Sequence, residues 1–114
     1  VAGGRGPEAW GRNYRVLDMT GQLFTEDKPV AAICHAAQTL AAADVLDGRR
    51  CSAYPACAPE VEAAGGTYVD VEMNEAVTDE NLVTAPAWPA HAAWIRQFLD
   101  VLGTRIEHAE PVTA

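Results

Sequence analysis

The chain has 114 residues, of which 49% are hydrophobic and 21% charged, and its formal net charge is -8 at pH 7. This composition is typical of one folded domain or part of one, and it differs from that of membrane-embedded or disordered chains. No apolar run approaches the roughly 20 residues that span a bilayer, nothing at the first residues resembles a signal peptide, and the negative charge argues against nucleic acid and anionic membranes as partners.

The first half of the chain shows helix, strand and helix patterns in turn. Residues 8–27 predict a helix, because Pro7 suits a first helical turn and apolar residues recur at helical spacing. Residues 29–33 form a short apolar run that is typical of a buried strand. The alanine-rich residues 35–46 predict the next helix, and the Asp-Gly pair that follows predicts a turn.

The second half is predicted to contain a strand, a helix and a second strand, at residues 49–54, 58–64 and 67–70. Residues 76–78 and 82–84 alternate as the strands of a hairpin, and Asn81 can adopt the left-handed conformation that its turn requires. Residues 89–102 predict an amphipathic helix. The alternation of strands and helices indicates a parallel α/β sheet, and such sheets place functional sites beyond the carboxyl ends of their strands.

Cys34 lies where the apolar strand changes into the alanine-rich helix. A strand-to-helix turn lifts a side chain out of the sheet and places it near helix N-terminal amides. Such amides favour a thiolate and donate to a developing oxyanion, which is what a nucleophilic cysteine needs. A small buried hydrophobic residue at the end of a strand would explain the same position.

The other two cysteines are Cys51, expected in a strand, and Cys57, expected at a loop or helix start. An odd number of cysteines without a signal sequence favours reduced thiols in the cytoplasm. The five residues between Cys51 and Cys57 match no strong zinc signature, so we expect no metal site.

Four segments in order resemble the DJ-1/PfpI superfamily. They are residues 3–8 (GGRGPE), 28–38 (KPVAAICHAAQ), 43–55 (ADVLDGRRCSAYP) and 81–91 (NLVTAPAWPAH). The last segment is similar to the branch that contains plant glyoxalase III-type members. The resemblance extends from about residue 2 to about residue 108.

This resemblance implies a flavodoxin-like sandwich with a parallel sheet, related to class I glutamine amidotransferases. Residues 1–114 correspond to the C-terminal half of a single DJ-1/PfpI domain. The N-terminal half is then expected as a cleaved segment, a separate chain or a missing segment, because a parallel sheet does not tolerate a bare central edge. The resemblance also implies a homo-oligomer.

The resemblance assigns the nucleophile to Cys34, a second site residue to His35 and a carboxylate to Glu8, which in hexameric relatives reaches a neighbouring subunit's Cys-His pair. Arg5 is expected to orient Glu8. The substrate pocket or oxyanion site is expected to include Gly4, Arg5, Ala36, Trp88 and His91. Because Ala36 stands where the family commonly has Gly, its methyl group puts rate and substrate size in question.

Each of these residues also has a simpler explanation. Glu8 would stabilise a helix N-terminus through the helix dipole, and His35 would be a packed or solvated side chain. Trp88 and Tyr54 would be core aromatic residues, and His91 would be a solvent-facing residue at a helix start.

The function that the resemblance implies is cofactor-independent conversion of small reactive carbonyls, glyoxal or methylglyoxal, to hydroxy acids. An intracellular cysteine peptidase is a second interpretation, although the small pocket expected here argues against protein substrates. A non-enzymatic sensor of oxidative stress is a third interpretation, since an exposed reactive cysteine oxidises readily. A structural fragment of an oligomer is the fourth.

Overall fold

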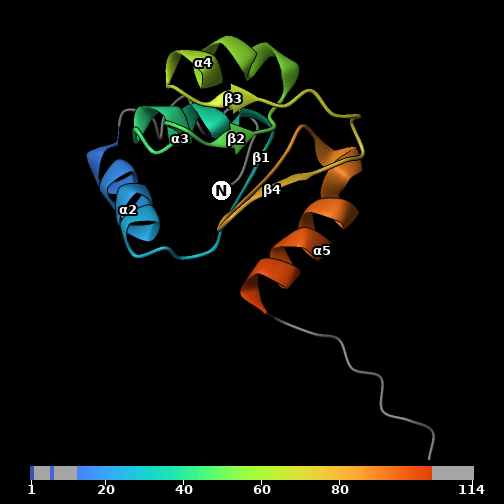
Figure 1. The fold of residues 1–114 in the computed structure, drawn as a ribbon. Helices are drawn as coiled ribbons and strands as arrows, with labels where there is room; N and C mark the ends of the chain where they lie inside the picture. Colours follow the sequence, from blue (N-terminus) through green and yellow to red (C-terminus); the bar gives the residue numbers. More distant parts are fainter. Residues whose placement is uncertain (2–5, 7–12, 104–114) are drawn as a thin grey trace, which may run out of the picture.

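The computed structural model describes residues 1, 6 and 13–103. Its helices are α2 (Tyr14–Thr25), α3 (Ala37–Ala42), α4 (Ala58–Ala63) and α5 (His91–Leu102). Its strands are β1 (Val30–Ile33), β2 (Arg50–Cys51), β3 (Thr67–Tyr68), β4 (Val77–Asp79) and β5 (Leu82–Ala85). Short 3-10 turns at Cys34–Ala36, Pro55–Cys57 and Trp88–Ala90 precede α3, α4 and α5 (Figure 1). No helix in the described part of the chain is long and apolar enough to cross a membrane.

Two small sheets organise these elements. The three-stranded sheet has the order β1-β5-β4, with β1 parallel to β5 and β4 antiparallel to β5. The second sheet is the parallel pair β2-β3. The predicted α/β class, the parallel pairing and the hairpin between β4 and β5 are therefore confirmed.

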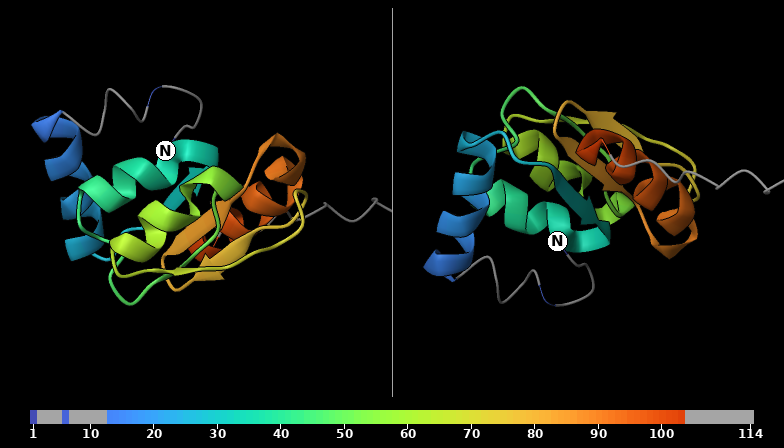
Figure 2. Two further views of the ribbon diagram at one scale, coloured as in Figure 1. Left: turned by 90° about the horizontal axis from the view of Figure 1, so that it is seen from above. Right: turned by 90° about the horizontal axis from the view of Figure 1, so that it is seen from below.

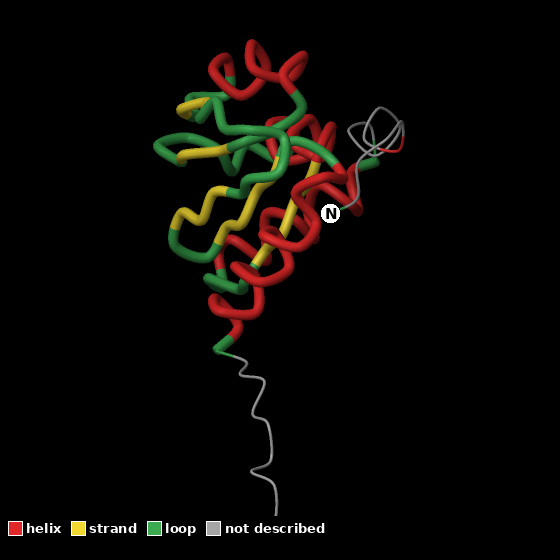
Figure 3. Tube along the Cα trace, turned by 90° about the vertical axis from the view of Figure 1, so that its right-hand side faces the viewer, coloured by secondary structure: helices red, strands yellow, loops and turns green. Residues whose placement is uncertain are grey.

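The helices cover the three-stranded sheet on both faces. Val30 and Ala32 of β1 belong to the main core cluster with residues of α3 and α4, which pack against each other (Figure 2). Ile33 belongs to a second cluster, against which Trp94 of α5 packs. Figure 3 shows α5 lying along the strands of this sheet. The alternation along β1 thus sends successive side chains to opposite layers.

Three helices end in the same hydrogen-bonded motif, and this explains why α3 is shorter than predicted. After α3, Asp44 has a φ of 58°, its N–H donates to the Ala41 carbonyl, and Val45 N–H donates to the Leu40 carbonyl. This pair of bonds is a Schellman motif, which satisfies carbonyls at a helix end. The same motif ends α2 at Asp27 and α4 at Gly65.

The turn between β4 and β5 differs from the prediction. The residue in the left-handed conformation is Glu80, with a φ of 54°, not Asn81. Asn81 is buried, and its side chain has another use: Nδ2 donates to the Lys28 carbonyl at 2.8 Å and Oδ1 accepts from Arg49 at 2.7 Å. Glu80 is exposed, so the strained position falls on the residue without buried contacts.

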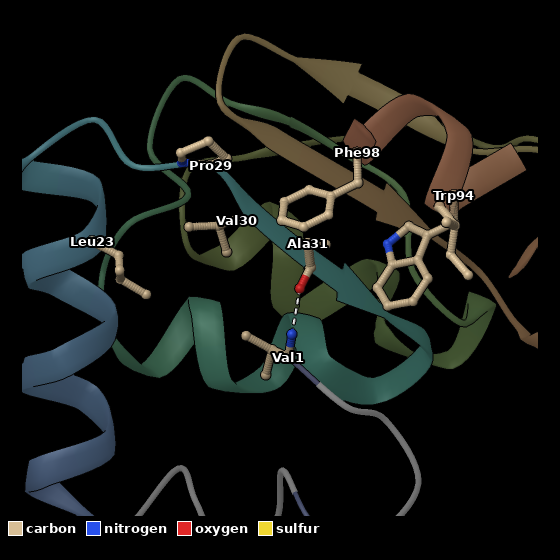
Figure 4. Close-up of a pocket in the computed structure, with 8 residues that line it drawn as sticks. Val1, Leu23, Pro29, Val30, Ala31, Trp94 and Phe98 are labelled. Atoms are coloured by element: carbon tan, nitrogen blue, oxygen red, sulfur yellow. Dashed lines mark hydrogen bonds between the residues drawn. The ribbon is translucent and has the colours of Figure 1, made fainter. Parts of the chain in front are cut away.

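Strand β1 lies at an edge of the three-stranded sheet, and β5 is the one described strand that pairs with it. On its other side, the backbone nitrogen of Val1 donates to the Ala31 carbonyl (Figure 4). An apolar groove of about 370 Å³ follows this edge, lined by Val1, Leu23, Pro29, Val30, Ala31, Trp94, Ile95 and Phe98. The edge of β1 therefore accepts backbone hydrogen bonds and lies next to exposed apolar surface.

Candidate active site

Cys34 is the first residue after β1, and its backbone is strained. Its φ is 61°, in the left-handed region that a residue with a Cβ adopts at a cost of about 1–2 kcal/mol. The turn carries the chain directly from the parallel strand into the 3-10 turn and α3. A strained backbone persists where the surroundings hold it, and such residues gather at functional sites. The predicted strand-to-helix turn is confirmed, and its strain adds an observation that the sequence did not supply.

His35 is in contact with the thiol. The distance from Cys34 Sγ to His35 Nδ1 is 3.2 Å, which makes this nitrogen a candidate acceptor of the thiol proton in the tautomer that leaves Nδ1 unprotonated. The two adjacent side chains therefore point to the same place. Both are partly buried, so water has limited access to the pair.

Tyr54 holds this pair from a distant part of the sequence. Its ring stacks on the His35 imidazole, with centroids 4.9 Å apart and planes 26° from parallel. Its backbone N–H donates to the Cys34 carbonyl at 3.1 Å. One residue thus fixes both the turn that carries the nucleophile and the ring of its partner. The same contacts explain why the strand predicted at residues 49–54 is shorter in the structure. The amide of Ser52 donates to Thr84 Oγ1 and the amide of Tyr54 donates to Cys34, so neither continues the pairing with β3, and β2 ends at Cys51.

The thiol opens into a pocket of about 430 Å³. Its lining residues are Ile33, Cys34, Tyr54, Met73, Ala87, Trp88, Pro89 and His91. Trp88 and His91 were both predicted at the substrate pocket from the sequence. Met73 was not, because it lies in an irregular segment without a periodic pattern, between β3 and β4. These residues bring four separate parts of the chain to one hollow beside the nucleophile.

The other predicted site residues have different positions. Ala36 is fully buried and belongs to the main core cluster. Gly4, Arg5 and Glu8 lie outside the described residues, so their predicted roles stay predictions.

Cys51 and Cys57 are buried and free, and neither lines this pocket. Burial raises the pKa of each thiol to about 11, with a neighbouring thiol adding to the rise at Cys51 and the Glu60 carboxylate at Cys57. Cys34, in contrast, is only partly buried. Access and environment thus separate Cys34 from the other two thiols. Within residues 1, 6 and 13–103, no three His, Cys, Asp or Glu side chains gather in a way that would hold a metal ion.

Comparisons with known proteins concern the family and the fold of the chain. The model of the DJ-1/PfpI family matches residues 1–101. Protein DJ-1 homolog D of Arabidopsis thaliana is 43% identical over 107 residues, which are 93% of this chain and 28% of that protein. A deglycase of Pyrococcus abyssi is 39% identical over 102 residues, which are 90% of this chain and 60% of the deglycase. The chain therefore spans less than two thirds of the length of these relatives.

A solved structure gives the same result for the fold. A two-domain protein of Anabaena variabilis, with DJ-1/ThiJ/PfpI-like and ferritin-like domains, superposes with a TM-score of 0.83 at 30% sequence identity. The superposition covers 90% of this chain and 28% of the Anabaena chain. The arrangement of sheet and helices described above is thus found in an experimental structure.

Proposed function

Because this chain belongs to the DJ-1/PfpI family, we propose that it carries the nucleophile of an enzyme that converts small reactive carbonyls to hydroxy acids. The observation that supports this most is the strained Cys34 turn with His35 Nδ1 at 3.2 Å from the thiol, at the mouth of a pocket. A nucleophile, an adjacent base and an open site are the parts that covalent catalysis at a carbonyl requires.

The proposed reaction needs no external oxidant or reductant. With methylglyoxal, His35 takes the thiol proton and Cys34 Sγ adds to the aldehyde carbon, which gives a hemithioacetal. A base removes the proton from that carbon to form an enediolate, and a proton returns to the neighbouring carbon, which gives a thioester of lactate. Water then cleaves the thioester and releases lactate and the thiol. The aldehyde carbon is oxidised and the ketone carbon is reduced, so the sum is methylglyoxal plus water to lactate.

The carboxylate that moves the proton between the two carbons is proposed to be Glu8 or a Glu of the expected N-terminal half of the domain. His35 is positioned for the first proton transfer, because its ring is fixed against Tyr54 and touches the sulfur. A fixed partner within hydrogen-bond distance is the geometric requirement for general base catalysis.

Methylglyoxal consumption and lactate formation by the native protein test this function. We expect Cys34→Ala to lower kcat/KM by at least about 10³-fold, since loss of a covalent nucleophile removes the whole pathway. Cys57→Ala is the matched control, because it removes a thiol that does not line the pocket, and it should keep most of the activity. Full activity in Cys34→Ala would exclude the proposed function.

A second substrate form follows from the deglycase among the relatives. We propose that the same thiol also attacks the carbinol carbon of glycated adducts, in which the former aldehyde carbon of methylglyoxal is bonded to an amine or a thiol. The bond from Cys34 Sγ to this carbon forms as the C–N or C–S bond of the adduct breaks. The amine or thiol leaves with the proton of the Cys34 thiol, and the resulting hemithioacetal follows the path described above. Release of free cysteine or lysine derivatives from methylglyoxal-treated amino acids, measured with the same two variants, tests this extension. Equal release by the native protein and by Cys34→Ala would contradict it.

We also propose that the site works in a larger unit, with the N-terminal half of the domain adding to the edge of β1 and with a second copy completing a homo-oligomer. The groove beside this edge exposes apolar surface of Ile95, which is 50% exposed, and Leu23, which is 39% exposed. Exposed apolar surface next to an edge strand is typical of an interaction site. The test is to express the 114 residues alone and record near-UV circular dichroism and sedimentation. A cooperative melt from a monomer would contradict this proposal.

A further inference from the structure

The pocket beside Cys34 has mainly apolar and aromatic walls. Its eight lining residues, all within the described part of the chain, include no Asp, Glu, Lys or Arg. Trp88 is 77% exposed, and Tyr54 and Met73 are each 39% exposed. A ligand that covers these side chains removes apolar surface from water, which favours binding in proportion to the area covered. The lining residues that have a polar side-chain group are Cys34, Tyr54, His91 and, through its indole N–H, Trp88.

The backbone at Trp88 is held in place, although the ring of this residue is exposed. It begins the 3-10 turn before α5, Pro89 follows it, and the neighbouring Ala87 and Ala90 are buried. A proline in the first turn fixes the backbone there. The backbone that carries the ring is therefore fixed, and the ring forms part of the pocket wall. The unbranched side chain of Met73, which also lines the pocket, can follow ligands of different shapes.

The surroundings of this pocket are acidic. A neighbouring hollow shares Met73 with it and is lined by Pro55, Asp70, Val71, Glu72, Met73 and Glu75. Glu72 and Glu75 are exposed carboxylates in this loop, and the whole chain has a formal net charge of -8. An anionic group that extends from the Cys34 pocket past Met73 meets carboxylates, and like charges at short range repel.

The size of the pocket exceeds what a three-carbon substrate needs. A volume of about 430 Å³ falls in the range of roughly 300–1,000 Å³ that is typical of sites for larger ligands. Methylglyoxal would leave most of this space to water. A substituent that extends from the carbonyl group would instead contact Trp88, Tyr54 and Met73.

From these observations we infer that the site selects carbonyl substrates with an extended neutral apolar substituent, and that Trp88 and Met73 determine this specificity. The chemical class is a 2-oxoaldehyde with an alkyl or aryl group of four or more carbons. The inference rests on the proposed function, because it names the substrate class of the same nucleophile.

The experiment compares kcat/KM for glyoxal, methylglyoxal and 2-oxohexanal with the native protein. The butyl group of 2-oxohexanal has three methylenes more than the methyl group of methylglyoxal. Each fully buried methylene raises kcat/KM about fourfold, and because the pocket is partly open we expect an overall preference of at least about tenfold for 2-oxohexanal. A second comparison replaces 2-oxohexanal by 4,5-dioxopentanoate, a 2-oxoaldehyde of similar length with a carboxylate end. Its kcat/KM should be lower than that of 2-oxohexanal, and added salt should narrow the difference by screening.

The variant Trp88→Ala should reduce the ratio of kcat/KM for 2-oxohexanal to that for methylglyoxal by at least about threefold, since it removes one wall of the pocket. Tyr14→Ala is the control. Tyr14 is an aromatic residue that is 81% exposed on α2 and does not line the pocket, so the ratio should stay the same.

The outcomes separate this inference from the proposed function. Equal or falling kcat/KM along the series, or a ratio that Trp88→Ala leaves unchanged, overturns the inference while turnover by Cys34 still supports the function. Turnover of none of these compounds overturns both. A rising series that Trp88→Ala flattens and Tyr14→Ala does not supports the inference.

Discussion

The strain at Cys34 predicts that replacing the nucleophile by glycine makes the protein more stable than replacing it by alanine. Both variants lose the thiol, so their difference isolates the backbone at a φ of 61°. Alanine retains a Cβ and the cost of about 1–2 kcal/mol that the left-handed conformation imposes. Glycine avoids that cost but loses about 0.5–1 kcal/mol more conformational entropy on folding. The difference between these two ranges is about 0–1.5 kcal/mol, so we expect Cys34→Gly to exceed Cys34→Ala in the free energy of unfolding by about 0.7 kcal/mol.

Asp44 provides a matched control for this comparison. Its φ of 58° is close to that of Cys34, and it lies at the exposed end of α3, outside the pocket. The pair Asp44→Gly and Asp44→Ala should show a difference of the same sign and similar size. Urea denaturation of the native protein and the four variants, followed by circular dichroism, gives the free energies, provided that the m-values agree.

The reasoning is refuted if Cys34→Ala is as stable as Cys34→Gly while the Asp44 pair shows the expected difference. The backbone at the nucleophile would then store no strain. If the prediction holds, the site retains a residue with a Cβ at a position whose backbone conformation favours glycine. A loss of stability in favour of function is expected at a strained catalytic residue.

Three further outcomes follow from the buried thiols and the turns. The folded state keeps Cys51 and Cys57 protonated up to about pH 11, whereas a free thiol ionises near pH 9, so the unfolded chain binds fewer protons in this interval. Stability should therefore fall as pH rises from about 9 to about 11, and denaturation midpoints that stay level across this range would contradict the assignment. Because Cys51 and Cys57 are buried and protonated, iodoacetamide at pH 7.5 should alkylate Cys34 well before these two thiols, as peptide mapping by mass spectrometry would show. Gly65→Ala should destabilise the protein more than Gly48→Ala, because both glycines have positive φ but only at position 65 would a Cβ overlap the side chain of Asp47 and press on its Cα, 3.3 Å away. Equal losses in urea denaturation would show that the overlap is relieved.

The elements with a clear period could be predicted from the sequence. The amphipathic pattern of residues 89–102 matches α5 and the short turn before it, and the alternation around residues 79–81 matches the hairpin. The position of Cys34 at a strand-to-helix turn followed from the abrupt change of composition around it. These features depend on neighbours within a few residues, which is the range that sequence patterns report well.

Features that depend on distant contacts could not be predicted in the same way. Tyr54 stacks on His35 from 19 positions later in the chain, and no local pattern marks this contact. Met73 reaches the pocket from an irregular loop. The end of α3 at Ala42 was missed because the alanine-rich pattern favoured a longer helix, whereas Asp44, in the left-handed conformation, completes the hydrogen bonds of the helix end.

The most direct test of the central claim is to observe the bond between Cys34 and the substrate. The native protein, Cys34→Ala and Cys57→Ala are each mixed with methylglyoxal labelled with ¹³C at the aldehyde carbon, and ¹³C NMR spectra are recorded at low temperature. We predict a protein-bound hemithioacetal resonance in the native protein and in Cys57→Ala, and none in Cys34→Ala. A resonance that persists in Cys34→Ala, or that disappears only in Cys57→Ala, would show that another group is the nucleophile.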